Sequence, residues 1–138
     1  MRIVLVPLGL LLFAVPAFAA DPVEGQWVTA DGGSKVRIGA CPSQAAQMCG
    51  VVSWLPANEV HDLDKRNPDA ALRSRAILGS QTIFGFQKKA AGSWSGGKLY
   101  DPATGKTYSG KIAANPNGTL KVQGCVFMIC QTQTWKRD

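Results

Sequence analysis

The residues best suited to acid–base or metal chemistry lie together between positions 56 and 67. His61 is the only histidine in the chain, and Asp62 and Asp64 follow it closely. An imidazole beside carboxylates could act as a general acid–base pair or bind a metal ion. The segment has few apolar residues to anchor it, and no nucleophile stands in a recognisable setting. We therefore favour a solvated loop and predict no catalytic residues, no metal and no cofactor; a hydrolase using His61 is the least favoured reading.

A second charged group follows directly in the sequence. Asn67 precedes a proline and is a good cap for a short helix near residues 68–75, the only helix that we expect. Asp69 and Arg73 are four residues apart, which suits a surface ion pair. Arg75 points to another side of such a helix and could bind an anion or a carboxylate at the rim of the domain.

Four cysteines indicate two disulfides rather than a metal or redox site. The chain has no Cys-x-x-Cys motif, and a single histidine argues against zinc. Three pairings are possible for four cysteines. We favour the local pairs Cys41–Cys49 and Cys125–Cys130, each closing a turn between adjacent strands. A cross pairing such as Cys41–Cys130 is the main alternative.

The first 19 residues have the pattern of an export signal. Arg2 precedes an apolar run over residues 3–15, and Ala17-Phe18-Ala19 fits the small-x-small cleavage rule. A membrane anchor is the alternative, but the run is short for a bilayer span. We predict a signal peptide over residues 1–19 and a single domain over 20–138. Loss of Arg2 lowers the net charge from +6 to +5, and the lysines are scattered, so we expect no nucleic-acid partner.

The elements that must position these residues are short strands. The hairpin over residues 94–110 is the clearest, because Pro102 and Gly105 suit its turn. Alternating apolar residues and turn signals mark eight strands: 25–29, 34–40, 49–55, 82–88, 94–100, 106–114, 119–126 and 130–137. Eight strands in chain order favour an all-β, up-and-down antiparallel barrel, with a sandwich as the alternative.

Closure of such a barrel would bring the two ends of the domain together. Arg137 would then lie across the face of Trp27, a cation–π contact that plugs one end. Strand alternation predicts eleven residues inside: Val36, Ile38, Val52, Trp54, Phe84, Phe86, Leu99, Tyr108, Ile112, Leu120 and Val122. On the last strand, either Trp135 points in with Gln131 and Gln133, or Thr132 and Thr134 do.

Motifs along nearly the whole domain resemble one bacterial family. They are Gly25-x-Trp27, Cys49-Gly50-x-Val52-x-Trp54, Asn67-Pro68-Asp69 followed by Leu72-Arg73-x-Arg75, Gly85-Phe86, Trp94-x-Gly96-Gly97-x-Leu99-Tyr100-Asp101-Pro102, Gly105-Lys106-x-Tyr108 and Gln133-x-Trp135-x-Arg137. In this pattern the chain is similar to the family called domain of unknown function 2147. The resemblance implies an exported bacterial protein with a small lipocalin-like barrel. It implies no established activity and no catalytic residues.

Together these patterns predict a binding protein rather than an enzyme. A small amphipathic or apolar ligand would enter the barrel mouth, with residues 56–67 as a lid. The predicted ligand-binding residues are Trp54, Phe86, Tyr108 and Gln133, joined by His61 and Arg75. The alternative is a protein–protein module, such as an inhibitor of exported hydrolases, that presents residues 56–67 and the 101–105 turn. In both cases we expect a monomer in the periplasm or secreted.

Overall fold

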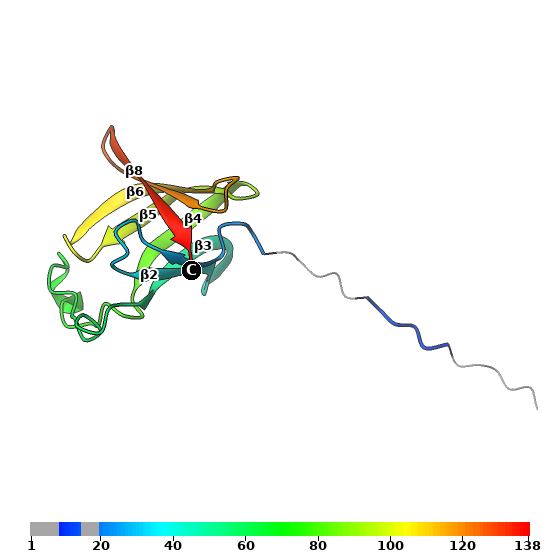
Figure 1. Cartoon of the computed structure of the whole chain (residues 1–138), viewed down its shortest axis with the longest axis horizontal. Helices are drawn as coiled ribbons and strands as arrows, with labels where there is room; N and C mark the ends of the chain where they lie inside the picture. The colour runs from blue at the N-terminus through cyan, green and yellow to red at the C-terminus, as the bar shows by residue number, and fades with distance from the viewer. Residues whose placement is uncertain (1–8, 15–19) are drawn as a thin grey trace, which may run out of the picture.

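Eight antiparallel strands close into a barrel (Figure 1). The computed structural model describes residues 9–14 and 20–138. The strands follow the chain around the barrel and are β1 Gly25–Val28, β2 Lys35–Cys41, β3 Gln44–Trp54, β4 Gln81–Ala90, β5 Ser93–Asp101, β6 Lys106–Ala114, β7 Leu120–Val126 and β8 Ile129–Arg137. The predicted up-and-down barrel is confirmed, and a sandwich is excluded because β1 pairs with β8.

The seam between β1 and β8 carries the predicted plug. Trp27 and Arg137 are cross-strand partners, and the guanidinium carbon of Arg137 lies 3.9 Å from the centroid of the Trp27 ring. The same guanidinium donates hydrogen bonds to the backbone carbonyls of Glu24 (2.6 Å) and Pro22 (3.1 Å). Gly25 makes room for this contact, because a Cβ at that position would collide with the guanidinium. The residues before β1 are thereby held against the end of the last strand.

The hydrophobic core fills the barrel from this plugged end. Trp27 is 1% exposed, and its indole N–H donates to the carbonyl of Val23. The Trp94 indole donates to the Asp21 carboxylate at 3.1 Å, so both rings are buried with their polar atoms satisfied. The core cluster consists of Val23, Trp27, Val36, Ile38, Met48, Ile83, Phe86, Trp94, Ile112, Leu120, Val122 and Trp135.

Two aromatic residues predicted to point inward lie on the outside instead. Trp54 is 40% exposed, because a register shift beside β2 pairs it with Lys35 rather than leaving it in line with buried Val52. The Lys35 ammonium lies 5.2 Å from the centroid of the Trp54 ring. Phe84 is 36% exposed although Phe86 is fully buried. A bulge beside β3 accounts for this second change: two residues lie between Ile83 and Phe86, whereas only one lies between their partners Gly50 and Met48 on β3.

The predicted helix near residues 68–75 is wrong beyond a single turn. The structure has only a 3₁₀ turn, η1 Ala70–Leu72, capped by the Asp69 side chain. None of its residues is buried, so no packing contact stabilises a longer helix. The expected Asp69–Arg73 ion pair is also wrong, since the Arg73 side chain donates to the carbonyl of Asn67 at 2.7 Å.

Both disulfides are local. Cys41 pairs with Cys49 across the β2–β3 turn, and Cys125 pairs with Cys130 across the β7–β8 turn. These are the pairs that the sequence favoured, and the cross pairing is absent from this part of the chain. Two disulfides fit an oxidising compartment.

The predicted signal peptide lies mostly outside the described residues. Residues 1–8 and 15–19, including the expected cleavage site, are not described. The described part, residues 9–14, forms neither helix nor strand, and its large side chains are exposed. Among the described residues, no helix has the length and apolar character that a membrane crossing requires.

Candidate ligand-binding site

The end of the barrel away from the plug opens into a cavity of about 830 Å³. Its apolar wall comes from residues of six strands, namely Val36, Val52, Ile83, Leu99, Val122 and Trp135. Its rim is formed by residues 29–34, the long connection between β3 and β4, and the turn after β5. Ligand pockets for small molecules are commonly 300–1,000 Å³, so the space is sufficient for one.

Neutral polar side chains share this lumen with the apolar wall. Gln131 and Gln133 on β8, Tyr108 on β6 and Thr82 on β4 all line the cavity. The Trp135 indole donates a hydrogen bond to the Gln133 side-chain oxygen at 3.1 Å, which leaves the amide N–H groups of Gln133 free to donate. Of the two arrangements considered for the last strand, the structure has the one with Trp135, Gln133 and Gln131 inside.

A glycine on β7 widens the lumen opposite Tyr108. A Cβ at Gly124 would come within 3.2 Å of the Tyr108 Cβ and 3.7 Å of Leu99. The three residues lie on neighbouring strands, with Tyr108 paired to Leu99. The absence of a side chain at position 124 therefore keeps the Tyr108 ring inside the cavity wall without crowding.

A buried carboxylate ties the long β3–β4 connection to the barrel. Asp64 is 1% exposed and accepts a hydrogen bond from the Tyr100 hydroxyl of β5 at 2.5 Å. It also accepts from the Asn67 amide and from Arg75, both at 2.9 Å, and the Arg75 contact is a salt bridge. The Arg75 guanidinium lies 5.8 Å from the centroid of the Tyr100 ring. One carboxylate thus joins two separate parts of the connection to a barrel strand.

The backbone of this connection is ordered by the same contacts. The Asp64 N–H donates to the carbonyl of Arg75, and the Ile77 N–H donates to the carbonyl of Asp62. The Arg66 guanidinium donates to the carbonyl of Ala103 in the β5–β6 turn at 2.8 Å. The connection is therefore a folded cover fixed to the rim rather than a loose loop.

The pKa values of Asp64 and Tyr100 are shifted in opposite directions. Burial raises the pKa of Asp64, but the hydrogen bonds from Asn67, Tyr100 and Arg75 outweigh it and hold the pKa below the usual value. Burial and the bond to Asp64 raise the pKa of Tyr100 to about 12. At neutral pH the carboxylate is ionised and the phenol is protonated, which is the state that the hydrogen bond requires.

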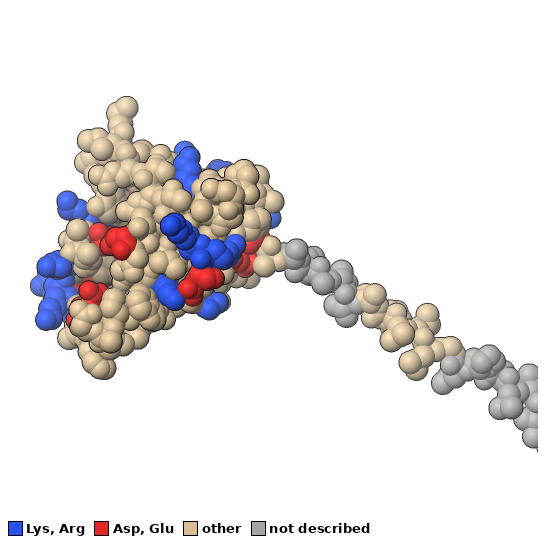
Figure 2. All heavy atoms as spheres, in the orientation of Figure 1, with Lys and Arg blue, Asp and Glu red and all other residues tan. Residues whose placement is uncertain are grey.

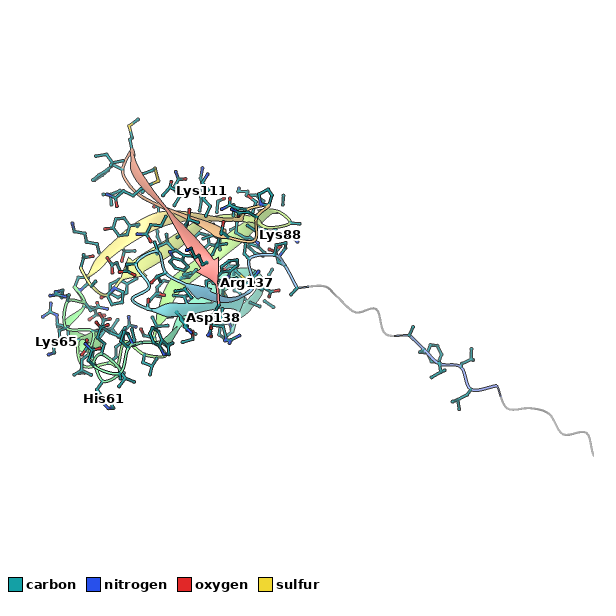
Figure 3. All side chains as sticks on the ribbon, viewed as in Figure 1. His61, Lys65, Lys88, Lys111, Arg137 and Asp138 are labelled. Atoms are coloured by element: carbon teal, nitrogen blue, oxygen red, sulfur yellow. A yellow bond between two sulfur atoms is a disulfide. The ribbon has the colours of Figure 1, made fainter. Side chains whose placement is uncertain are left out.

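The residues predicted to bind ligand are divided among four places. Tyr108 and Gln133 line the cavity. Phe86 is fully buried in the core beneath it, and Trp54 lies on the outer surface. His61 is exposed on the connection and lies at its outer edge, near Lys65 (Figure 3). Arg75 holds the Asp64 carboxylate, which is the rim carboxylate role that the sequence allowed.

Sequence reasoning missed several features of the site. The Asp64–Tyr100 contact joins residues 36 positions apart, and no local sequence pattern predicts it. Thr82 was not singled out, although it lines the cavity beside Ile83. Among the described residues, no three His, Cys, Asp or Glu side chains gather to hold a metal ion.

A closed eight-stranded barrel with one sealed end and an open lumen is the architecture of the lipocalin class. The solved structure of protein HP1028 from the human pathogen Helicobacter pylori, which is assigned to the lipocalin family, matches with a TM-score of 0.74 and 26% identity. The match covers 84% of this chain and 82% of that chain. No curated protein matches the sequence. Residues 25–137 match the model of the family described as "Uncharacterized protein conserved in bacteria (DUF2147)", and the chain belongs to this family.

Proposed function

We propose that the protein is an exported, periplasmic binding protein for one small amphipathic ligand. The observation that carries this proposal is the open cavity of about 830 Å³ with a mixed lining. Its volume and its few polar groups on an apolar wall are the usual features of a binding site. The lipocalin-like fold supports small-ligand binding in general.

The lining favours a ligand with an apolar body and an uncharged, hydrogen-bonding group. The deep wall of Val36, Val52 and Trp135 offers no charge. Gln131, Gln133 and Tyr108 supply amide and hydroxyl groups that can both donate and accept. Charged residues stand only at the rim, where water still screens them.

A binding role fits the side chains better than a catalytic one. His61 is exposed at the edge of the connection and is absent from the cavity wall. The buried carboxylate of Asp64 is fully occupied by three hydrogen-bonding side chains. A general base needs a free lone pair within reach of the substrate, so the role of Asp64 is to hold the cover in place.

The test is a fluorescence titration with N-phenyl-1-naphthylamine, a neutral apolar probe with one N–H donor. Gln131→Trp places a bulky ring in the mouth, and Thr132→Trp places the same ring on the outer face of the same strand as a matched control. We expect one probe per chain, at least tenfold weaker binding in the first variant, and unchanged binding in the second. Equal affinity in both variants, or no saturable binding, would contradict the proposal.

A further inference from the structure

The hairpin between β7 and β8 ends in the most exposed apolar group of the domain. Phe127 is 99% exposed, Met128 97%, Ile129 76% and Val126 42%. Figure 1 shows this hairpin projecting beyond the body of the barrel. Four consecutive apolar residues at a projecting turn form the kind of surface that marks an interaction site. We call residues 126–129 the apolar tip.

The turn itself does not require apolar residues. Val126 and Ile129 are cross-strand partners, so Phe127 and Met128 form a two-residue turn. Phe127 has a φ of 55°, in the left-handed region that side chains of this kind rarely adopt. A two-residue turn with a positive φ at its first central residue alone favours glycine at that position. The chain thus places a phenyl ring at an unfavourable backbone position, and the Cys125–Cys130 disulfide directly behind the tip fixes the hairpin.

The strands on the side of the barrel that carries the apolar tip are basic, whereas the tip itself has no charge. The five strands β4–β8 contain eight lysine and arginine residues and one carboxylate, Asp101. No charged residue lies between Lys121 and Lys136, and in Figure 2 the projecting hairpin shows only uncharged residues. Among the described residues, ion pairs engage Lys35, Arg75 and Lys88, so the lysines beside the hairpin keep their charge unpaired.

Two of these lysines stand on the outer face at the end of the barrel that carries the tip. The Lys98 ammonium donates to the Ser109 hydroxyl at 3.0 Å, and Ser109 is the cross-strand partner of Cys125, directly behind the tip. Lys106 is the first residue of β6, which begins at the same end of the barrel as the tip. Both side chains are exposed.

We propose that the apolar tip inserts into the surface of an anionic lipid bilayer, with Lys98 and Lys106 facing the lipid phosphates. Four side chains on a convex turn offer far less than the roughly 800 Å² per partner of a standard protein interface. A fluid lipid surface needs no matching shape, and it combines apolar insertion with attraction of basic residues. The charge around the tip therefore favours a negatively charged membrane over a protein partner.

Docking in this way would bring the ligand cavity to the membrane. The turns after β1, β3, β5 and β7 are all at the same end of the barrel, because strands alternate in direction. The apolar tip and the cavity rim consequently share one end, while the plug lies at the other. The docking proposal itself does not depend on ligand binding, and each can fail without the other.

The test is flotation of the protein, purified after export, with vesicles of phosphatidylcholine alone or mixed with phosphatidylglycerol at three to one. The key variant is Phe127→Gly with Met128→Asn, which places glycine at the position with positive φ and so protects the fold. Leu72→Ser is the matched control, because Leu72 is also exposed and apolar but lies on η1. We expect at least a tenfold loss of binding to the mixed vesicles in the double variant and none in the control.

The charge contribution is tested separately with Lys98→Gln and Lys106→Gln together. We expect a several-fold loss on the mixed vesicles and no loss on phosphatidylcholine, and millimolar inorganic phosphate should not compete if the bilayer is the target. Wild-type protein that ignores the mixed vesicles, or a double tip variant that still floats, would overturn the proposal. Tip-dependent dimers in size-exclusion chromatography without vesicle binding would overturn it in favour of self-association.

Discussion

The two ends of the barrel differ in whether their inward-facing polar groups are already hydrogen-bonded within the protein. At the plugged end, the Trp27 and Trp94 indoles are buried and each donates to a nearby oxygen. At the open end, Gln131, Gln133 and Tyr108 face a cavity in which their polar groups remain available. The first arrangement stabilises the fold, and the second leaves hydrogen-bonding capacity for a ligand.

The connections between strands also differ between the two ends of the barrel. Short turns join the strands at the plugged end, whereas the open end carries the long β3–β4 connection and the projecting apolar tip. In this barrel the core is sealed at the plugged end. The other end is free to vary in loop length and surface chemistry, and the functional proposals concern that end.

The strongest test of this comparison removes the plug. Trp27→Ala should lower the free energy of unfolding by about 3–5 kcal/mol, because a large ring fully buried in the core is lost. Trp54→Ala is the control, and it should cost less than about 1 kcal/mol since that ring is on the outer surface. Urea denaturation followed by circular dichroism measures both. Equal costs would show that the core is not centred on the plugged end.

The next effect concerns the cover at the open end. Asp64→Ala should lower the free energy of unfolding by about 2–3 kcal/mol, because it leaves the Arg75 charge and the Tyr100 hydroxyl without their hydrogen-bond partner. This loss is smaller than that for a fully buried ion pair, because the Arg75 side chain is 29% exposed. Hydrogen exchange should show faster exchange at the amides of Asp64 and Ile77, with the β1–β2 amides unchanged. Uniform acceleration throughout the barrel would mean that the cover is part of the global folding unit.

Each end has one disulfide, and the two can be compared directly. Replacing Cys41 and Cys49 by alanine should cost about 2–3 kcal/mol, and replacing Cys125 and Cys130 should cost about 2 kcal/mol, because the second loop is shorter. Urea denaturation again provides the values. A larger cost for the second pair would reveal that the projecting hairpin contributes to the stability of the barrel beyond its own turn.

The smallest expected effect is a change in pH dependence. The pKa of Asp64 is lowered by folding, so its contribution is complete at pH values above the unfolded pKa and is lost as pH falls through the folded pKa. Tyr100→Phe removes one of the hydrogen bonds that lower this pKa and should cost about 1 kcal/mol at neutral pH. Loss of the cover in acid should then begin at higher pH, as followed by NMR of the Asp64 amide. If the pH dependence of the variant were identical to that of the wild type, Tyr100 would not contribute to lowering the pKa of Asp64.

The sequence predicts the barrel well because each strand has its own local pattern. Alternation in β2 and β7, together with the matching motifs around Trp27 and Arg137, leads to a closed barrel with a defined seam. The disulfides were predictable for the same reason, since each closes a short segment. Local information was sufficient wherever the structure is built from neighbouring strands.

The errors arose where a single residue changes the register. An extra residue at a bulge reverses the facing of every later side chain in the strand. Gly85 has a φ of 62° and marks such a position between Phe84 and Phe86. The cover was unpredictable for a different reason, because Asp64 finds Tyr100 only after the strands have assembled.

The β1–β8 seam has a consequence for the time order of folding. Only two residue pairs join these strands, Trp27 with Arg137 and Val28 with Lys136, and they are separated by more than a hundred residues. A chain that emerges progressively from a ribosome or a secretion channel can form each hairpin as it appears, but it cannot complete the cylinder until residue 137 arrives. Until that moment β1 remains an unpaired edge on one side, open to a neighbouring chain or to a chaperone.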